Sequence, residues 1–107
     1  MTVWYGVRDL DRARAFYTEK LGFHEVYRDE AGRWMRLARD GNELALAESP
    51  DETGAVLSVV VKDVKGEAER LRRAGVEVGV VLEIHGMIRL LDVFDPDGNR
   101  LQLTQDL

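Results

Sequence analysis

Hydrophobic residues recur along the chain with two alternating periods. Residues 2–7, TVWYGV, alternate in the manner of a half-buried strand. Over residues 8–23 the spacing becomes helical, and Phe16 and Tyr17 are expected to pack in the core; the apolar positions are Leu10, Ala13, Phe16, Tyr17 and Leu21. Asp9 or Asp11 can cap the start of this helix, and Gly22 can end it in a left-handed conformation. The pattern predicts a strand followed by a helix.

Three short strands are expected to complete this first unit. Alternating residues occur at 23–29, FHEVYRD, at 33–40, RWMRLARD, and at 43–48, ELALAE. Asp40-Gly41-Asn42 lies before the last of them, and these residue types suit a tight reversal. Residues 1–48 therefore predict a βαβββ unit.

The same order of elements starts again after residues 49–54, SPDETG, whose polar composition with Pro and Gly is typical of a connector. Residues 55–61 predict a strand, 62–76 a helix, and 76–84 and 87–94 two further strands. Asp63 corresponds to Asp9 and Gly75 to Gly22, and Asp97-Gly98-Asn99 precedes a last strand, RLQLTQ. We predict one α+β domain over 1–107, built from tandem βαβββ units at 1–48 and 55–107. Their helices would shield one face of a curved sheet, and its other face would surround a cup.

Alternation within each strand assigns side chains to the helix or to the cup. In each strand the apolar residues that meet the helix occupy one face, and the residues between them are expected to face the cup. The expected cup residues are Thr2, Trp4, Gly6, Trp34, Arg36, Ala45, Ala47, Val56, Ser58, Val60, Gln102 and Thr104. Alternation does not assign the faces of the strand at 87–94, where Arg89 and Leu91 are the candidates for the cup.

Composition narrows the class of protein. The 107 residues are 45% hydrophobic and 33% charged, which is typical of one globular domain. The net charge of −5, with no block of Lys and Arg, argues against nucleic acid or an anionic membrane as a partner. The chain has no cysteine, which excludes disulfides and thiolate catalysis. The sequence shows neither a signal peptide nor a membrane-spanning stretch, so we expect a cytoplasmic protein.

Three segments together resemble the vicinal oxygen chelate superfamily: VRDLDRARAFYTEKLGF, VVVKDVKGEAERLRRAGV and FDPDGNRLQLTQ. This superfamily includes glyoxalase I, extradiol dioxygenases, fosfomycin-resistance enzymes and bleomycin-resistance proteins. In its metal-using members the ligands lie on the first and last strand of each unit. The corresponding positions here are Thr2, Ala45, Val56 and Gln102, of which only Gln102 suits the role. Because an open metal site needs about three protein ligands, the chain is closest in character to the metal-free bleomycin-resistance type.

The two tryptophans suggest what such a cup would bind. Trp4 and Trp34, on different strands, can sandwich a planar ring, or they can instead fill the cup or form a subunit interface. Arg36 can meet a ligand carboxylate or phosphate, or can form a salt bridge within the chain. The predicted ligand-binding residues are Trp4, Trp34, Arg36, Ala45, Ser58, Arg89 and Gln102, with no catalytic residue, metal or cofactor. The resemblance also implies a homodimer with sites at the interface, where Trp4 and Trp34 meet Gln102 or Arg89 of the partner.

Other polar residues are better explained without a site. We expect His24 and His85 to have surface or packing roles rather than to bind metal or act as bases. We expect Glu43, Glu48 and Glu83, next to turns, to be solvated.

Three functions remain open. The first is a metal-free binding protein that sequesters a hydrophobic, partly planar aromatic molecule, such as an antibiotic in resistance or a metabolite. The second is a divergent metal-dependent lyase or isomerase, or a thiol transferase. The third is a structural or regulatory subunit whose cup is filled by its own side chains. The missing ligands favour the first, so the chain is expected not to be an enzyme.

Overall fold

A computed structural model describes residues 3–48 and 56–107 of the chain. Thr2 and the connector expected at 49–54 lie outside the described residues. The chain forms two compact units, the first of Met1–Ala55 with Pro96–Asn99, and the second of Val56–Asp95 with Arg100–Leu107.

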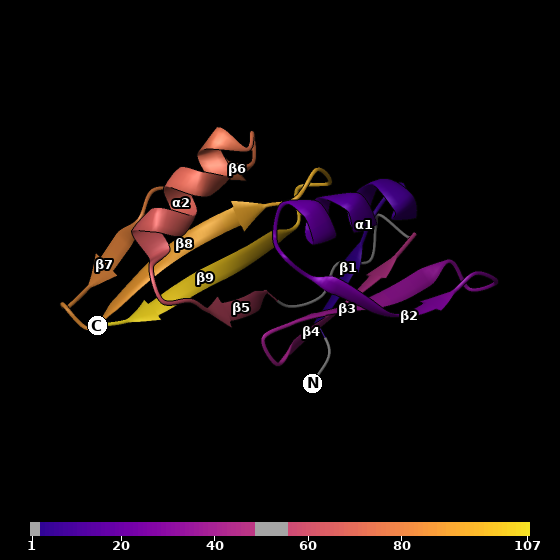
Figure 1. The fold of residues 1–107 in the computed structure, drawn as a ribbon, viewed down its shortest axis with the longest axis horizontal. Coiled ribbons are helices and arrows are strands. Elements are labelled where there is room, and N and C mark those ends of the chain that lie inside the picture. The colour runs from indigo at the N-terminus through magenta and orange to yellow at the C-terminus, as the bar shows by residue number, and fades with distance from the viewer. Residues whose placement is uncertain (1–2, 49–55) are drawn as a thin grey trace. The chain divides into compact units, whose positions relative to one another are not determined.

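The first unit has one helix against one sheet (Figure 1). Its elements are β1 (Val3–Gly6), α1 (Leu10–Glu19), β2 (His24–Asp29), β3 (Trp34–Arg39) and β4 (Asn42–Ala47). The sheet order is β1-β4-β3-β2, in which β1 is parallel to β4 and the other neighbours are antiparallel. This is the predicted βαβββ order.

Local signals in the sequence account for both ends of α1. The Asp9 carboxylate accepts a hydrogen bond from the Arg12 N–H at 3.1 Å, which satisfies a donor that has no partner within the helix. After the helix, Gly22 has φ 73°, a left-handed conformation that a residue with a Cβ rarely adopts. Tyr17 is fully buried and its ring centroid lies 6.5 Å from that of Tyr5 in β1, so aromatic packing helps to hold the helix on its sheet.

The second unit repeats this arrangement with one difference. Its elements are β5 (Leu57–Val60), α2 (Val64–Arg73), β6 (Glu77–Val78), β7 (Leu82–Ile84), β8 (Ile88–Phe94) and β9 (Arg100–Asp106). The sheet order is β5-β9-β8-β6, and β7 also pairs with β8. The single strand expected at 76–84 is therefore wrong: residues 79–81 interrupt it, because Val78 pairs with Val93 whereas Leu82 pairs with Leu90, which leaves an extra residue between the two pairings.

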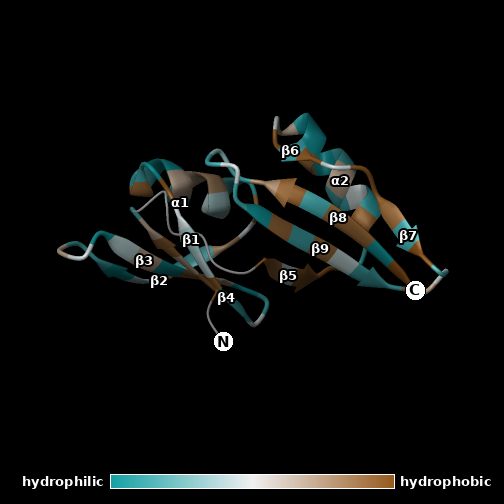
Figure 2. Cartoon of the chain, turned by 180° about the vertical axis from the view of Figure 1, so that it is seen from behind, coloured by the Kyte–Doolittle hydropathy of each residue, from teal (hydrophilic) through white to brown (hydrophobic). Residues whose placement is uncertain are grey.

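The hydrophobic alternation is visible along β8 and β9, where brown and teal residues succeed one another (Figure 2). Leu91, Val93, Leu101 and Leu103 are buried on the side of α2, together with Val64, Ala68 and Leu71 of the helix. The second unit is thus again a βαβββ unit, with its second strand divided into β6 and β7. The α+β class and the two tandem units are confirmed.

The turn before β9 lies with the first unit. The Asn99 side chain is buried and donates from Nδ2 to the Gly6 carbonyl at 2.9 Å. Arg8 donates from Nε to Asp97 Oδ1 at 2.7 Å and from its backbone N–H to the same oxygen at 3.1 Å. The Asp-Gly-Asn turns of the two units therefore differ: the second holds the end of β1, whereas the first only reverses the chain between β3 and β4.

Neither helix in the described part of the chain is long and apolar enough to cross a membrane.

Candidate functional site

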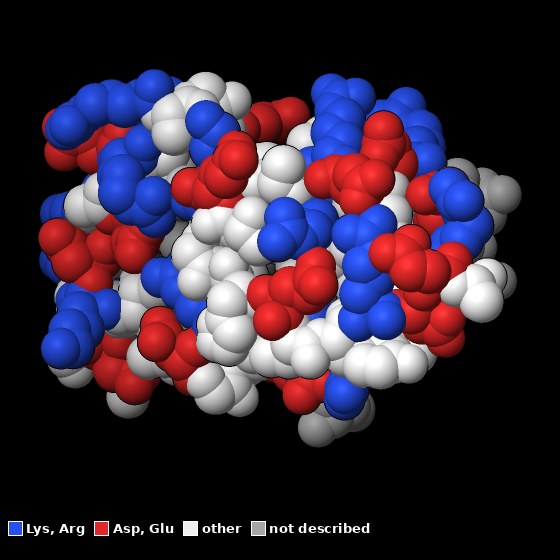
Figure 3. Space-filling view, turned by 45° about the vertical axis from the view of Figure 1, so that its right-hand side comes forward, with Lys and Arg blue, Asp and Glu red and all other residues white. Residues whose placement is uncertain are grey.

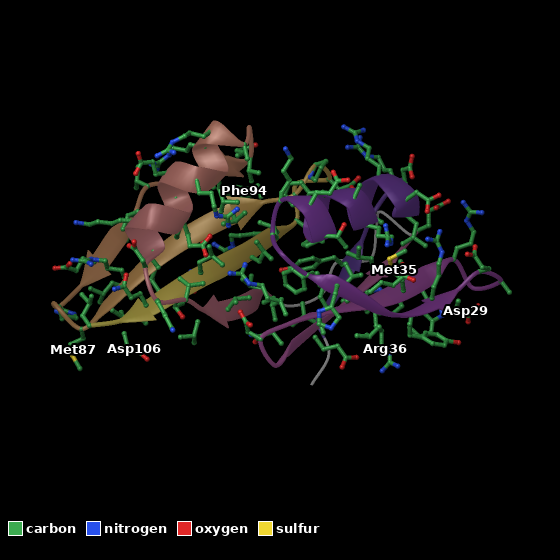
Figure 4. The ribbon with its side chains drawn as sticks, in the orientation of Figure 1. Asp29, Met35, Arg36, Met87, Phe94 and Asp106 are labelled. Atoms are coloured by element: carbon green, nitrogen blue, oxygen red, sulfur yellow. The ribbon has the colours of Figure 1, made fainter. Side chains whose placement is uncertain are left out.

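We call the face of each sheet that is turned away from its helix the open face. In the first unit Met35 and Leu37 are fully buried on the helix side, and the residues between them point the other way. Figure 4 shows this for β3, where Met35 lies on the side of α1 and Arg36 on the opposite side. Pairing of Ala45 with both Trp4 and Arg36 places all three in one row across the open face.

Three aromatic rings gather on this open face. The Trp4 and Trp34 ring centroids are 6.2 Å apart, and those of Tyr27 and Trp34 are 5.2 Å apart. We call Trp4, Tyr27 and Trp34 the aromatic cluster. Trp4 is 36% exposed and Tyr27 44%, so the cluster presents aromatic surface to solvent, whereas Ala45 between their strands is only 1% exposed. Because Ala45 has a small side chain, the rings of the aromatic cluster form the outermost layer of this face.

Trp34 is held in place by its own turn. Its Nε1 donates to Asp29 Oδ2 at 3.2 Å, and the other oxygen of Asp29 accepts the Gly32 N–H at 2.9 Å. The indole lies so close to Gly32 that a Cβ there would be 2.8 Å from its Cδ1, a distance that real Cβ atoms essentially never show. Asp29 and Gly32 therefore fix the orientation of the indole before any ligand arrives.

Tyr27 was missed by the sequence reasoning because β2 contains a bulge. Glu25 pairs with Leu37 and Tyr27 with Arg36, which leaves Val26 as the extra residue. Both Glu25 and Arg28 face α1, where they pair with Arg14 and Asp11 at 2.6 Å. Strict alternation puts residues 25 and 27 on one face, and only the bulge moves Tyr27 to the other. No glycine marks the bulge in the sequence.

Arg36 lies beside the aromatic cluster and forms the salt bridge that was the alternative to ligand binding. Its Nη1 donates to Glu43 Oε1 at 3.1 Å, and its guanidinium carbon lies 5.4 Å from the centre of the Tyr27 ring. Its Nε is buried and has no hydrogen-bond partner. The guanidinium is therefore only partly engaged, and most of its donors remain for other acceptors.

In the second unit a polar row crosses the open face. Ser58 pairs with Gln102, and Gln102 with Asp92. Gln102 Nε2 donates to Asp92 Oδ1 at 3.3 Å, and Arg100 lies 3.6 Å from the other oxygen of Asp92. Ser58 and Gln102 thus have the predicted orientation, and Asp92 joins them.

The placement of Arg89 and Leu91 in the cup was wrong. Leu91 is 1% exposed in the core beneath α2, and Arg89, two residues away on the same strand, shares its face. Arg89 pairs in register with Gln105, whose side chain accepts the Val64 N–H at the start of α2, and it forms an ion pair with Glu83 at 3.1 Å. Arg89 therefore does not belong to the set of open-face residues.

The residues present do not fit a metal centre at the positions that the superfamily uses. Ala45 and Val56 carry no donor atom in their side chains, so Gln102 is the one residue of these three that could bind a metal. Thr2 lies outside the described residues. Within residues 3–48 and 56–107, no group of three or more His, Cys, Asp or Glu side chains is arranged to hold a metal ion.

The remaining polar candidates have other environments. His24 is exposed on β2, and His85 is exposed in the β7–β8 turn with φ 53°. Glu48 is not simply solvated, since it accepts the Leu10 N–H at 3.2 Å and pairs with Arg33. Across the surface in Figure 3, Lys and Arg side chains alternate with Asp and Glu, and neither sign predominates.

Comparison with known proteins identifies the family. The model of the glyoxalase/bleomycin resistance protein/dioxygenase superfamily matches residues 2–103. The chain belongs to this superfamily. No curated protein is similar enough in sequence to count as a relative.

Several solved structures resemble the chain over nearly its whole length. The first is TnmS3, an antibiotic-binding protein from Streptomyces sp. CB03234, with 29% identity over 99% of this chain and 93% of that one and a TM-score of 0.83. The second is a bleomycin resistance determinant encoded on the transposon Tn5, with 25% identity, 99% and 96% coverage and a TM-score of 0.75. The third is the fosfomycin resistance protein FosX from Listeria monocytogenes, with 18% identity, 100% and 92% coverage and a TM-score of 0.81; it shows the fold alone.

Proposed function

We propose that this superfamily member is a metal-free binding protein that sequesters a hydrophobic, partly planar aromatic molecule such as an antibiotic or a metabolite. The aromatic cluster carries the proposal. Trp4 and Tyr27 are exposed, the ring centroid of each lies within 6.2 Å of that of Trp34, and Asp29 and Gly32 fix Trp34 in place. Rigid exposed rings offer a large stacking area at a low cost in conformational entropy.

Two of the similar structures support this choice of ligand. TnmS3 is an antibiotic-binding protein and the Tn5 protein is a bleomycin resistance determinant. A role in antibiotic resistance inside the cytoplasm belongs to the same proposal. The residues at the superfamily's metal-ligand positions also favour a metal-free protein, because a lyase, isomerase or thiol transferase that depends on a metal needs about three protein ligands. Ala45 and Val56 cannot supply them.

We also propose that the protein is a homodimer with its binding sites at the interface. This part rests on the resemblance to superfamily members in which unit one of one chain completes the sheet of unit two of the other. Arg89 leaves the set of residues expected there, since it lies on the helix side, and Ser58 and Gln102 remain. A mass of 12.1 kDa in solution, independent of concentration, would refute the dimer.

Tryptophan fluorescence tests the binding proposal directly, because both tryptophans of the chain lie in the aromatic cluster. Metal-analysed protein would be titrated with planar aromatic antibiotics and metabolites. We expect a saturable change in emission without metal, which is weakened at least about tenfold in Trp34→Ala by loss of the stacking surface. Val80→Ala, at an exposed position between β6 and β7, is the matched control and should bind as the unaltered protein does. No response, together with one bound metal per chain, would favour the enzyme instead.

A further inference from the structure

On the open face of the first unit, Asp29 has a hydrogen-bond partner on each oxygen, whereas Arg36 has few partners for its N–H groups. Asp29 accepts from Trp34 and Gly32, one bond on each oxygen. Arg36 is the one Lys or Arg side chain on this face of the described strands, and a single one of its N–H groups is taken, by Glu43. The buried Nε has no partner. Since unpaired buried donors are costly, the arrangement is suited to an additional acceptor at Arg36.

The bond between Arg36 and Glu43 can be exchanged at little cost. Their side chains are 43% and 37% exposed, and ion pairs so open to solvent contribute little to stability. A guanidinium binds a carboxylate best through two parallel N–H bonds, whereas Glu43 makes one. A ligand carboxylate that arrives in a better geometry can therefore take the place of Glu43.

The position of Arg36 limits where such a carboxylate sits on the ligand. Arg36 is two residues from Trp34 on β3, so their Cα atoms are roughly 7 Å apart on the same face. Its guanidinium carbon is 5.4 Å from the centre of the Tyr27 ring. A ring stacked on the aromatic cluster brings a carboxylate attached directly to it within reach of Arg36.

We propose that Arg36 and Glu43 select the ligand by charge, and that the preferred ligand is a planar aromatic carboxylate whose anionic group displaces Glu43 from Arg36. This inference rests on the proposed function, because it assumes that a ring binds at the aromatic cluster. It adds the chemical class of the ligand and gives Glu43 a role as an internal competitor. Removal of the Glu43 carboxylate should then strengthen the binding of an anionic aromatic ligand but not that of an uncharged one.

Matched probes separate stacking from charge selection. Anthracene-9-carboxylate and 9-anthracenemethanol have the same ring system and differ in charge, and each would be titrated by calorimetry at neutral pH. The unaltered protein should bind the carboxylate about five to ten times more tightly than the alcohol. Arg36→Gln should reduce this ratio to about one. Glu43→Gln should raise it several-fold further while the affinity for the alcohol stays unchanged.

The outcomes distinguish failure of charge selection from failure of the proposed binding of aromatic ligands. If both probes bind but their affinity ratio is the same in the unaltered protein, Arg36→Gln and Glu43→Gln, charge selection is overturned and the aromatic site stands. If neither probe binds at millimolar concentration, both are overturned. Should Arg36→Gln fail to fold, Glu43→Gln alone decides, because a structural role for Glu43 does not predict tighter binding of one probe only.

Discussion

Glu48 and Gln105 occupy equivalent places in the two units and make the same bond. Each is the sixth residue after the Asn of an Asp-Gly-Asn turn. Glu48 Oε2 accepts the N–H of Leu10, the first residue of α1, at 3.2 Å, and Gln105 Oε1 accepts that of Val64, the first residue of α2, at 3.0 Å. The internal repeat thus preserves a hydrogen-bond acceptor, and it tolerates exchange of a carboxylate for an amide.

This equivalence predicts that Glu48→Gln is mild and Glu48→Ala is not. The glutamine keeps an acceptor for the Leu10 N–H, so the free energy of unfolding should fall by no more than about 0.5 kcal/mol, whereas alanine should cost about 1 kcal/mol or more. Urea unfolding followed by circular dichroism measures both. Arg33→Ala is the control, because it removes the exposed ion pair with Glu48 but leaves the bond to α1. Equal losses in the two Glu48 variants would mean that charge matters rather than the acceptor.

Much of the first unit could be predicted because its strands alternate cleanly. In β3 the apolar Met35 and Leu37 flank the charged Arg36, so period two alone assigned Arg36, and with it Trp34, to the opposite face. β8 gave no such signal, since Ile88 and Leu90 are as apolar as Leu91 and Val93. There the register with β9, and the bond from Gln105 to α2, place Arg89 on the helix side.

Tyr27 illustrates a different limit. Its face depends on one inserted residue in β2, and the sequence around Val26 has no glycine or other signal for a bulge. The split of the strand at 76–84 also arises from an extra residue, set by pairing with β8. Local patterns predict which residues form strands, whereas pairing with neighbours decides small shifts of register.

Asn99 is expected to matter more for stability than Asn42, although both follow Asp-Gly. Asn99 is 6% exposed and bonds to the Gly6 carbonyl, and Asn42 makes only an exposed contact of 3.4 Å to the Asp40 carbonyl. Asn99→Ala leaves a buried carbonyl without this donor and should lower the free energy of unfolding by about 1–3 kcal/mol. Asn42→Ala, the matched control, should change it by less than about 0.5 kcal/mol. Similar losses in a denaturant titration would contradict a special role for the second turn.

The ionised Asp11 carboxylate should stabilise the folded protein, and this contribution should be lost at acidic pH. Its hydrogen bond from Arg28, together with the charge of Arg28, lowers the pKa of Asp11 below the ordinary 3.8. Because the pKa is lower in the folded state, the contribution is present above pH 3.8 and is lost as pH falls through the folded value. Carboxyl chemical shifts should show Asp11 titrating at lower pH than an unpaired aspartate. In Arg28→Gln it should titrate near the ordinary value, and an unchanged titration there would exclude Arg28 as the cause.

Deletion of Val26 tests whether the bulge is needed to form the aromatic cluster. Without Val26, regular pairing can still join Glu25 to Leu37 and the tyrosine that follows it to Arg36. Glu25 and the tyrosine would then lie on opposite faces of the sheet, as they do in the unaltered protein. The deletion should therefore keep the tyrosine on the open face beside Trp34, and cost no more than about 1 kcal/mol of stability. Deletion of the fully buried Leu37 is the control, because it moves one end of β3 to the wrong face and should prevent folding. Near-ultraviolet circular dichroism reports the packing of the rings. Loss of that signal in a folded Val26 deletion would show that the bulge itself, through its added twist, aims Tyr27 at Trp34.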